Sequence, residues 1–214
     1  MIQKKWTLLS LSAASLFMAS CDDGENIEEM HEATLEIDRI KNETIEGLNE
    51  LYALENDLQE RFSETLETDT DLATLADGSS PVFANIASRQ EIINQLETNQ
   101  DELGTNKDTL DTYEGEQLQQ QEVDDVTAQV DTFNEHLSSY REMYQLSLDN
   151  QRVYFTSLSD EEATYDDFVE GIQSVNEERQ SVREHLLELD DELVVLDESV
   201  QTLMNTMEEL LNEE

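Results

Sequence analysis

The sequence predicts an all-α fold, an elongated bundle of three to four long helices packed as coiled-coil-like antiparallel hairpins. Among its 214 residues the chain has only 6 Gly and 1 Pro, so residues that interrupt helices are scarce. Hydrophobic residues make up 37% and aromatic residues 6% of the chain, which is lean for a globular core but suits narrow apolar seams. Apolar residues also recur at alternating steps of three and four, the spacing of a coiled coil.

Residues 1–20 have the layout of a bacterial signal peptide, with two lysines followed by a short apolar segment. Cys21 is the single cysteine of the chain and directly follows the small residues Ala19 and Ser20. The stretch from Met18 to Cys21 resembles a lipobox, in which the cysteine receives a diacylglyceryl lipid and becomes the mature N-terminus. Residues 21–26 would then be the lipidated cysteine and a polar tether. The alternative is an ordinary signal peptide with an incidental cysteine.

The rest of the chain, residues 27–214, is predicted to be a single elongated helical domain. Gly78 permits a helix to stop, and Ser80 followed by Pro81 suits the start of the next helix. The stretch 95–121 is poor in large apolar residues, so we expect a kink, a loop or an exposed helical arm there. The predicted helices cover approximately residues 27–75, 82–113, 118–158 and 165–212.

The last two predicted helices carry the most regular seams. Between residues 165 and 210, 13 of the 14 seam positions are apolar, and Arg179 is the exception. The run from 123 to 158 keeps the same rhythm, and only residues 159–164 separate the two runs. A connection this short predicts neighbouring antiparallel helices. Two candidate N-terminal capping boxes lie at this connection, Ser159 with Glu162 and Thr164 with Asp167.

The charge of the chain is strongly negative. It has 53 acidic and 11 basic residues, a formal net charge of −42. This charge excludes nucleic-acid binding, because both partners would be polyanions. It equally repels anionic lipids and anionic wall polymers unless divalent cations bridge them. An acidic, well-solvated surface is typical of halophilic adaptation, and the other interpretation is a surface for a basic partner.

The sequence contains no recognisable catalytic or metal-binding motif. His31, His136 and His185 are far apart and none belongs to a zinc-binding pattern. No phosphate-binding glycine loop and no nucleophile motif is present. We therefore predict a non-enzymatic protein with no metal and no cofactor, apart from the covalent diacylglyceryl lipid and its palmitate-like acyl chains on Cys21.

A candidate interaction cluster of aromatic residues and one arginine lies around the predicted hairpin tip. It could form a platform for a glycan or a peptide, or it could be core. A charge on a seam is costly unless it has a partner, and antiparallel folding brings Tyr144 opposite Arg179. We expect the Arg179 guanidinium to stack on Tyr144 or Tyr140, or else to reach into water. The cluster consists of Tyr140, Tyr144, Tyr154, Tyr165 and Arg179.

The stretch SYREMYQLSLDNQRVYFTSLSDEEATYDDFVEGIQSVNEE, residues 139–178, is similar to the YkyA-like cell-wall binding lipoproteins of Gram-positive bacteria. The resemblance implies an exported, lipid-anchored, all-α protein that associates with the wall and has no known enzymatic activity. Members of that family are rich in Lys as well as Glu, and this chain is poor in Lys. The matching residues are Arg141, Tyr144, Tyr154, Leu158, Thr164, Ile172 and Asn176.

These observations lead to one functional expectation and one alternative. The expected protein is an extracytoplasmic structural or adaptor protein, held by its lipid on the outer face of the cytoplasmic membrane. Its expected partners are the membrane, a cell-wall component or an envelope protein, and divalent cations. The alternative is a glycan- or solute-binding module that uses the Tyr-rich hairpin tip.

Overall fold

The computed structural model describes residues 26–213, and these residues form helices without any strand. The predicted all-α class is therefore confirmed. Four helices are long and one is short. In chain order they are α1 (Ile27–Thr68), α2 (Ala73–Asp77), α3 (Pro81–Leu110), α4 (Gln120–Ser157) and α5 (Tyr165–Glu213).

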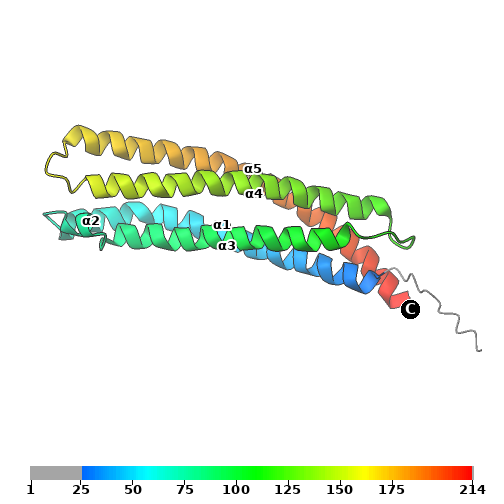
Figure 1. Cartoon of the computed structure of the whole chain (residues 1–214). Helices are drawn as coiled ribbons and strands as arrows, with labels where there is room; N and C mark the ends of the chain where they lie inside the picture. The colour runs from blue at the N-terminus through cyan, green and yellow to red at the C-terminus, as the bar shows by residue number, and fades with distance from the viewer. Residues whose placement is uncertain (1–25, 214) are drawn as a thin grey trace, which may run out of the picture.

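The four long helices run alternately up and down an elongated bundle (Figure 1). α1 packs on α3, α3 on α4, α4 on α5, and α5 returns to α1. The start of α1, the loop 111–119 and the end of α5 lie at one end, here called the proximal end (Figure 1). α2 and the turn 158–164 lie at the opposite, distal end. The 42 residues of α1 span about 63 Å at 1.5 Å per residue, so the molecule is a rod.

The first predicted helix, over residues 27–75, is interrupted in the structure. α1 ends at Thr68, and Leu72 then adopts a left-handed conformation with φ 52°. The carboxylate of Asp69 accepts hydrogen bonds from the backbone N and from Oγ1 of Thr74, both at 2.7 Å. Asp69 thus satisfies donors at the start of the short helix α2, and this local competition explains why α1 stops early.

The entry to α3 has the signals that the sequence predicted. Gly78, at φ 77°, ends α2 in the left-handed conformation that a side chain disfavours. Oγ of Ser80 accepts a hydrogen bond from the backbone N of Val82 at 3.3 Å, and Pro81 occupies the first helical position.

One of the two predicted capping boxes forms at the α4–α5 turn. Thr164 donates from its backbone N to the Asp167 carboxylate at 2.8 Å, and Asp167 N donates to Thr164 Oγ1 at 3.2 Å. Thr164 Oγ1 also donates to the same carboxylate at 2.6 Å, and the two hydrogen bonds that this carboxylate accepts from Thr164 lower the pKa of Asp167. The predicted Ser159 box is wrong, because Ser159 lies in the turn after α4 and donates to the carbonyl of Thr156 at 2.7 Å.

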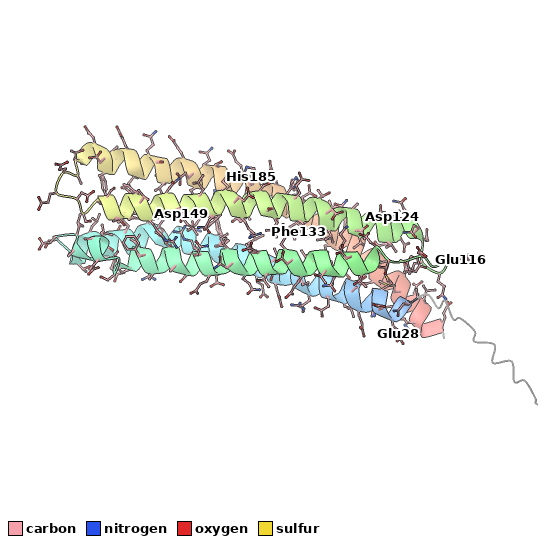
Figure 2. All side chains as sticks on the ribbon, viewed as in Figure 1. Glu28, Glu116, Asp124, Phe133, Asp149 and His185 are labelled. Carbon is pink, nitrogen blue, oxygen red and sulfur yellow. The ribbon has the colours of Figure 1, made fainter. Side chains whose placement is uncertain are left out.

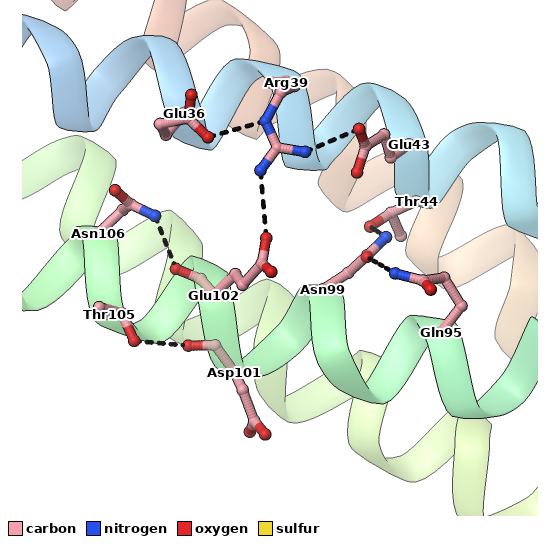
Figure 3. A network of polar contacts seen from close by, with 10 residues as sticks. All are labelled: Glu36, Arg39, Glu43, Thr44, Gln95, Asn99, Asp101, Glu102, Thr105 and Asn106. Carbon is pink, nitrogen blue, oxygen red and sulfur yellow. Dashed lines mark hydrogen bonds and ion pairs between the residues drawn. The ribbon is translucent and has the colours of Figure 1, made fainter.

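The polar stretch 95–121 is helical as far as Leu110, and only residues 111–119 form a loop. Its polar side chains bridge helices instead of weakening the fold. Asn99 is 1% exposed and donates to Oγ1 of Thr44 in α1 at 3.1 Å (Figure 3). Gln100 donates to the backbone carbonyl of Asn134 in α4 at 2.8 Å.

The apolar seams meet in one continuous core. Of the 11 seam positions expected in α4, ten are buried, and Tyr154 is half-buried. α5 behaves differently along its length. Its seam is buried at Val182 and at most seam positions that follow, but none of the five preceding positions is buried. Those five are Tyr165, Phe168, Ile172, Val175 and Arg179.

The scarce basic residues stand mainly between helices, while acidic side chains project along the whole rod (Figure 2). Arg39 binds Glu36 and Glu43 within α1 and reaches Glu102 of α3 at 3.1 Å (Figure 3). Three further ion pairs of Lys or Arg among residues 26–213 follow the same principle, since each uses one cation to join two helices. They are Lys41–Asp197, Lys107–Asp131 and Arg141–Glu97.

Candidate functional site

Aromatic rings gather at the distal end, where α1, α4 and α5 meet. The Phe62 ring lies 5.0 Å from that of Phe155 and 6.0 Å from that of Phe168, measured between centroids. Tyr165 stacks on Phe168 at 6.3 Å and is 78% exposed. Phe155 is buried and Tyr165 is open to solvent, so this cluster is core on one side and surface on the other.

Tyr154 holds α5 against α4 in this region. Its hydroxyl donates to the backbone carbonyl of Phe168 at 3.0 Å. Its ring lies on Gly171, where an added Cβ would stand 2.0 Å from Tyr154 Cε2. Burial raises the pKa of Tyr154 to about 12. Gly171 is therefore needed for the close approach of the ring to the helix backbone.

Tyr140 and Tyr144 form a second aromatic group in the interior of the rod. Their ring centroids are 5.6 Å apart, and each residue is 1% exposed. Burial raises the pKa of both hydroxyls, and the nearby Arg89 partly opposes this increase. Both side chains belong to the core, so they offer no accessible binding platform.

A buried polar layer centred on Arg89 lies beside the two tyrosines. The Arg89 side chain is fully buried and donates to Asn85 Oδ1 at 2.9 Å and to Gln151 Oε1 at 2.6 Å. Gln151 donates to Ser147 Oγ at 3.0 Å, and Asn85 donates to the Leu54 carbonyl at 2.8 Å. The layer thus connects α1, α3 and α4, and it specifies one arrangement of these helices.

Glu55 supplies negative charge to this layer. Burial raises its pKa, and the positive charges of Arg89 and Arg179 lower it in part. Neither Arg89 nor Glu55 was predicted from the sequence as part of a site. The available signal was the position of Arg89, three residues after Ile86 and four before Ile93, which places its side chain on the seam of α3.

The five residues of the predicted interaction cluster divide into two groups. Tyr154 and Tyr165 lie at the distal end, about 15 Å along α4 from the Tyr140–Tyr144 pair. Burial raises the pKa of Tyr144, and Arg179 lies close enough for its positive charge to oppose this rise in part, but its guanidinium donates to the side-chain carbonyl of Asn56 in α1. Stacking of Arg179 on either tyrosine stays a prediction.

The cysteine and the histidines considered as candidate site residues lie outside these clusters. Cys21 lies outside the described residues. His185 Nδ1 is 3.1 Å from Glu188 within α5, and His136 Nδ1 is 3.5 Å from Glu192 across the α4–α5 boundary. Within residues 26–213, no group of three or more His, Cys, Asp or Glu residues is arranged to hold a metal ion. No helix in this range is long and apolar enough to span a bilayer.

The fold and the surface place the protein in the class of elongated, acidic helical bundles. In this bundle, aromatic and polar layers determine how the helices pack. The comparison with family models is more specific. Residues 25–210 match the YkyA family, described as "Putative cell-wall binding lipoprotein", and the chain belongs to this family. No curated protein and no solved structure matches the chain.

Proposed function

We propose that the protein is a non-enzymatic structural or adaptor lipoprotein, anchored by Cys21 on the outer face of the cytoplasmic membrane. The family match over residues 25–210 supports an envelope role. The observation that carries the proposal is the direction in which the rod is built. α1 begins at the proximal end with Ile27, only six residues after Cys21.

This direction would orient the rod on the membrane. Asn26 is the fifth residue after Cys21, and an extended chain over five residue steps spans at most about 18 Å. A lipid on Cys21 would therefore keep the proximal end near the bilayer. The distal end would then stand about 60 Å further out, given the length of α1.

The charge of the protein explains why a lipid would be required. A net charge of −42 repels anionic headgroups, so the protein surface alone would not adhere to them. Two acyl chains supply stable attachment through burial of their methylene groups. Direct contact with an anionic wall polymer would need divalent cations, whereas contact with a protein would not.

The anchor is tested by Cys21→Ala, with Ser20→Ala as the neighbouring control. Cells are supplied with a traceable fatty acid, and the membrane and soluble fractions are compared. Cys21→Ala should lose the label and leave the membrane as a processed protein or remain as the precursor, while Ser20→Ala should behave as the wild type. Processed Cys21→Ala protein that stays in the detergent phase would refute the anchor.

The adaptor role is tested by crosslinking on intact cells with and without Ca²⁺. Recovery of one protein at a defined ratio, independent of Ca²⁺, supports the adaptor. Recovery of wall polymer only when Ca²⁺ is present contradicts it and favours a cation-bridged polymer contact.

A second candidate function, glycan or solute binding at the distal end, is favoured by the 78% exposure of Tyr165 beside Phe168. An exposed aromatic ring offers a flat apolar face, on which the C–H groups of a sugar ring can stack. Tyr165→Ala should then reduce co-sedimentation with isolated wall. Leu146→Ala, which alters a 60% exposed apolar side chain of α4 away from the distal end, is the control.

A further inference from the structure

An apolar groove opens between α1 and α5 in the middle of the rod, with a volume of about 670 Å³. Solvent reaches its walls, since Leu187 is 58% exposed, Val194 56% and Tyr52 44%. These three exposed apolar side chains adjoin further apolar residues in a single groove, and a contiguous apolar patch of this kind marks an interaction surface. The apolar lining consists of Ile45, Leu48, Tyr52, Leu186, Leu187, Leu193 and Val194.

Both walls of the groove keep a spacing of seven residues. On α1, Tyr52 follows Ile45 at this spacing, and on α5, Val194 follows Leu187 in the same way. Heptad-spaced walls of two antiparallel helices form holes that accept the side chains of a third helix. The α5 wall runs from Arg183 to Glu198, about 22 Å or four helical turns.

On its α5 side the rim of the groove carries three carboxylates and one cation. They are Asp190, Asp197, Glu198 and Arg183. Asp197 binds Lys41, whereas neither Asp190 nor Glu198 forms an ion pair with any residue between 26 and 213. Two carboxylates therefore remain available for cations of a partner, within the field of a chain whose net charge is −42.

We propose that the α1–α5 groove docks a cationic amphipathic helix of a partner protein. The helix would seat apolar residues spaced i, i+3, i+4 and i+7 between Tyr52 and Leu187, and would place Lys or Arg side chains against Asp190 and Glu198. This inference rests on the adaptor role proposed above and specifies the partner of that role. A second copy of the chain and an anionic polymer are disfavoured, because each brings further negative charge to the rim.

The probe is a fluorescent peptide of about 18 residues, roughly 27 Å of helix, with leucines at those spacings and lysines elsewhere. Its control is a scrambled peptide of identical composition without an apolar face. Anisotropy is measured on the whole chain in a mild nonionic detergent at about 0.15 M salt, where the Debye length is about 8 Å. The amphipathic peptide should bind with a Kd at least about tenfold lower than that of the scrambled one.

Paired variants locate the binding. Leu187→Gln with Val194→Gln should weaken binding about tenfold or more, because both substitutions replace apolar side chains of the groove wall by polar ones without adding charge. Leu146→Gln with Val153→Gln is matched in residue type and in spacing of seven, but lies on α4, where the residues are 60% and 71% exposed. This control should bind the peptide as the wild type does. Circular dichroism verifies that both variants retain their helices.

The outcomes separate the proposal from its rivals. Equal affinity for the two peptides, or equal affinity of the two paired variants for the amphipathic peptide, would mean general charge attraction and would overturn the groove site. Self-association of the wild type that the groove variant abolishes, without peptide binding, would assign the groove to a second copy. Displacement of the peptide by wall polymer would assign it to the polymer. Cys21→Ala leaves this assay unchanged, so failure of the anchor and failure of the groove are distinguishable.

Discussion

The two halves of α5 carry the same heptad rhythm but have different surroundings. From Val182 onward the seam is mostly buried, and Leu189, Leu196, Val200 and Leu203 are fully excluded from solvent. Between Tyr165 and Arg179 no seam residue is buried. α5 lies on the outer side of α4 in the distal half and crosses toward α1 in the proximal half (Figure 1). A regular seam thus identifies a helix and its inner face, but not how many neighbours cover that face.

The difference in burial implies a difference in local stability. Residues with few buried apolar contacts open at a lower free energy than residues in the core. The distal half of α5 depends on particular contacts, such as the Tyr154 ring on Gly171 and the hydrogen bond from Arg179 to Asn56. The proximal half depends on apolar burial.

The largest expected effect separates the two halves directly. Leu196→Ala removes a side chain that is 0% exposed, and should lower the free energy of unfolding by about 2–5 kcal/mol. Ile172→Ala removes a half-buried side chain from the distal half and should cost clearly less. Urea unfolding followed by circular dichroism measures both changes.

Hydrogen exchange gives an independent check of that pair. Amides between 165 and 180 should exchange faster than those between 189 and 207 in the wild type. Equal costs for Leu196→Ala and Ile172→Ala, together with uniform exchange along α5, would contradict the division into two halves.

The next effect concerns the close approach of Tyr154 to Gly171. Gly171→Ala would displace the ring and its hydrogen bond to Phe168, so we expect a loss of about 1–3 kcal/mol in stability. Gly104→Ala in α3 is the control, because an added Cβ there meets no atom within 4 Å, and it should stabilise by about 0.4–1 kcal/mol. If Gly171→Ala is neutral or stabilising in thermal melts, the ring does not limit the approach of the two helices.

The smallest expected effect is the pH dependence of Glu55, which lies between Arg89 and Arg179. Its pKa is raised mainly by burial, so the folded state binds its proton more tightly than the unfolded state does. Stability contributed by this group is present at low pH and is lost as pH rises above the unfolded value near 4.5. The wild type should therefore lose stability relative to Glu55→Gln between about pH 4 and pH 7.

The measurement is the difference between urea unfolding curves of the wild type and Glu55→Gln at several pH values. All other acidic groups are common to both proteins, so their titration cancels in the difference. A difference that is constant with pH, or that favours the wild type more strongly as pH rises, would mean that burial does not control this carboxyl group.

The sequence predicted the parts of the fold that depend on periodicity and local capping. The seam of α4, the capping box of Thr164 and the start of α3 at Pro81 all follow from such rules. The stop at Thr68 was missed because it depends on Asp69 reaching Thr74 across a left-handed residue, which an unbroken apolar pattern conceals. The stretch 95–121 was expected to contain a kink, a loop or an exposed arm because it is poor in large apolar residues, and the hydrogen bond from Asn99 to Thr44, 55 residues away, could not be read from that composition.

The candidate site was less predictable, because it depends on contacts between residues that lie far apart in the chain. An aromatic at a seam position is expected to face inward, which holds for Tyr144 but not for Tyr165 at the end of the rod. The hydrogen bond from Arg179 to Asn56 of α1 was not predicted, because the two residues lie 123 positions apart in the chain. The α1–α5 groove could not be predicted, because it depends on two helices more than 100 residues apart in the chain.

The positions of the interhelical ion pairs have a mechanical consequence. Arg39 joins α1 to α3 and Lys41 joins it to α5, both within the first four or so turns of α1. A tensile force applied between Asn26 and the middle of the rod acts along the helix axes. Such a force loads both ion pairs at the same time, in shear. A pull at the 158–164 turn that separates α4 from α5 would instead open that hairpin one turn at a time. The rod should therefore resist tension from its proximal end far better than peeling from its distal end.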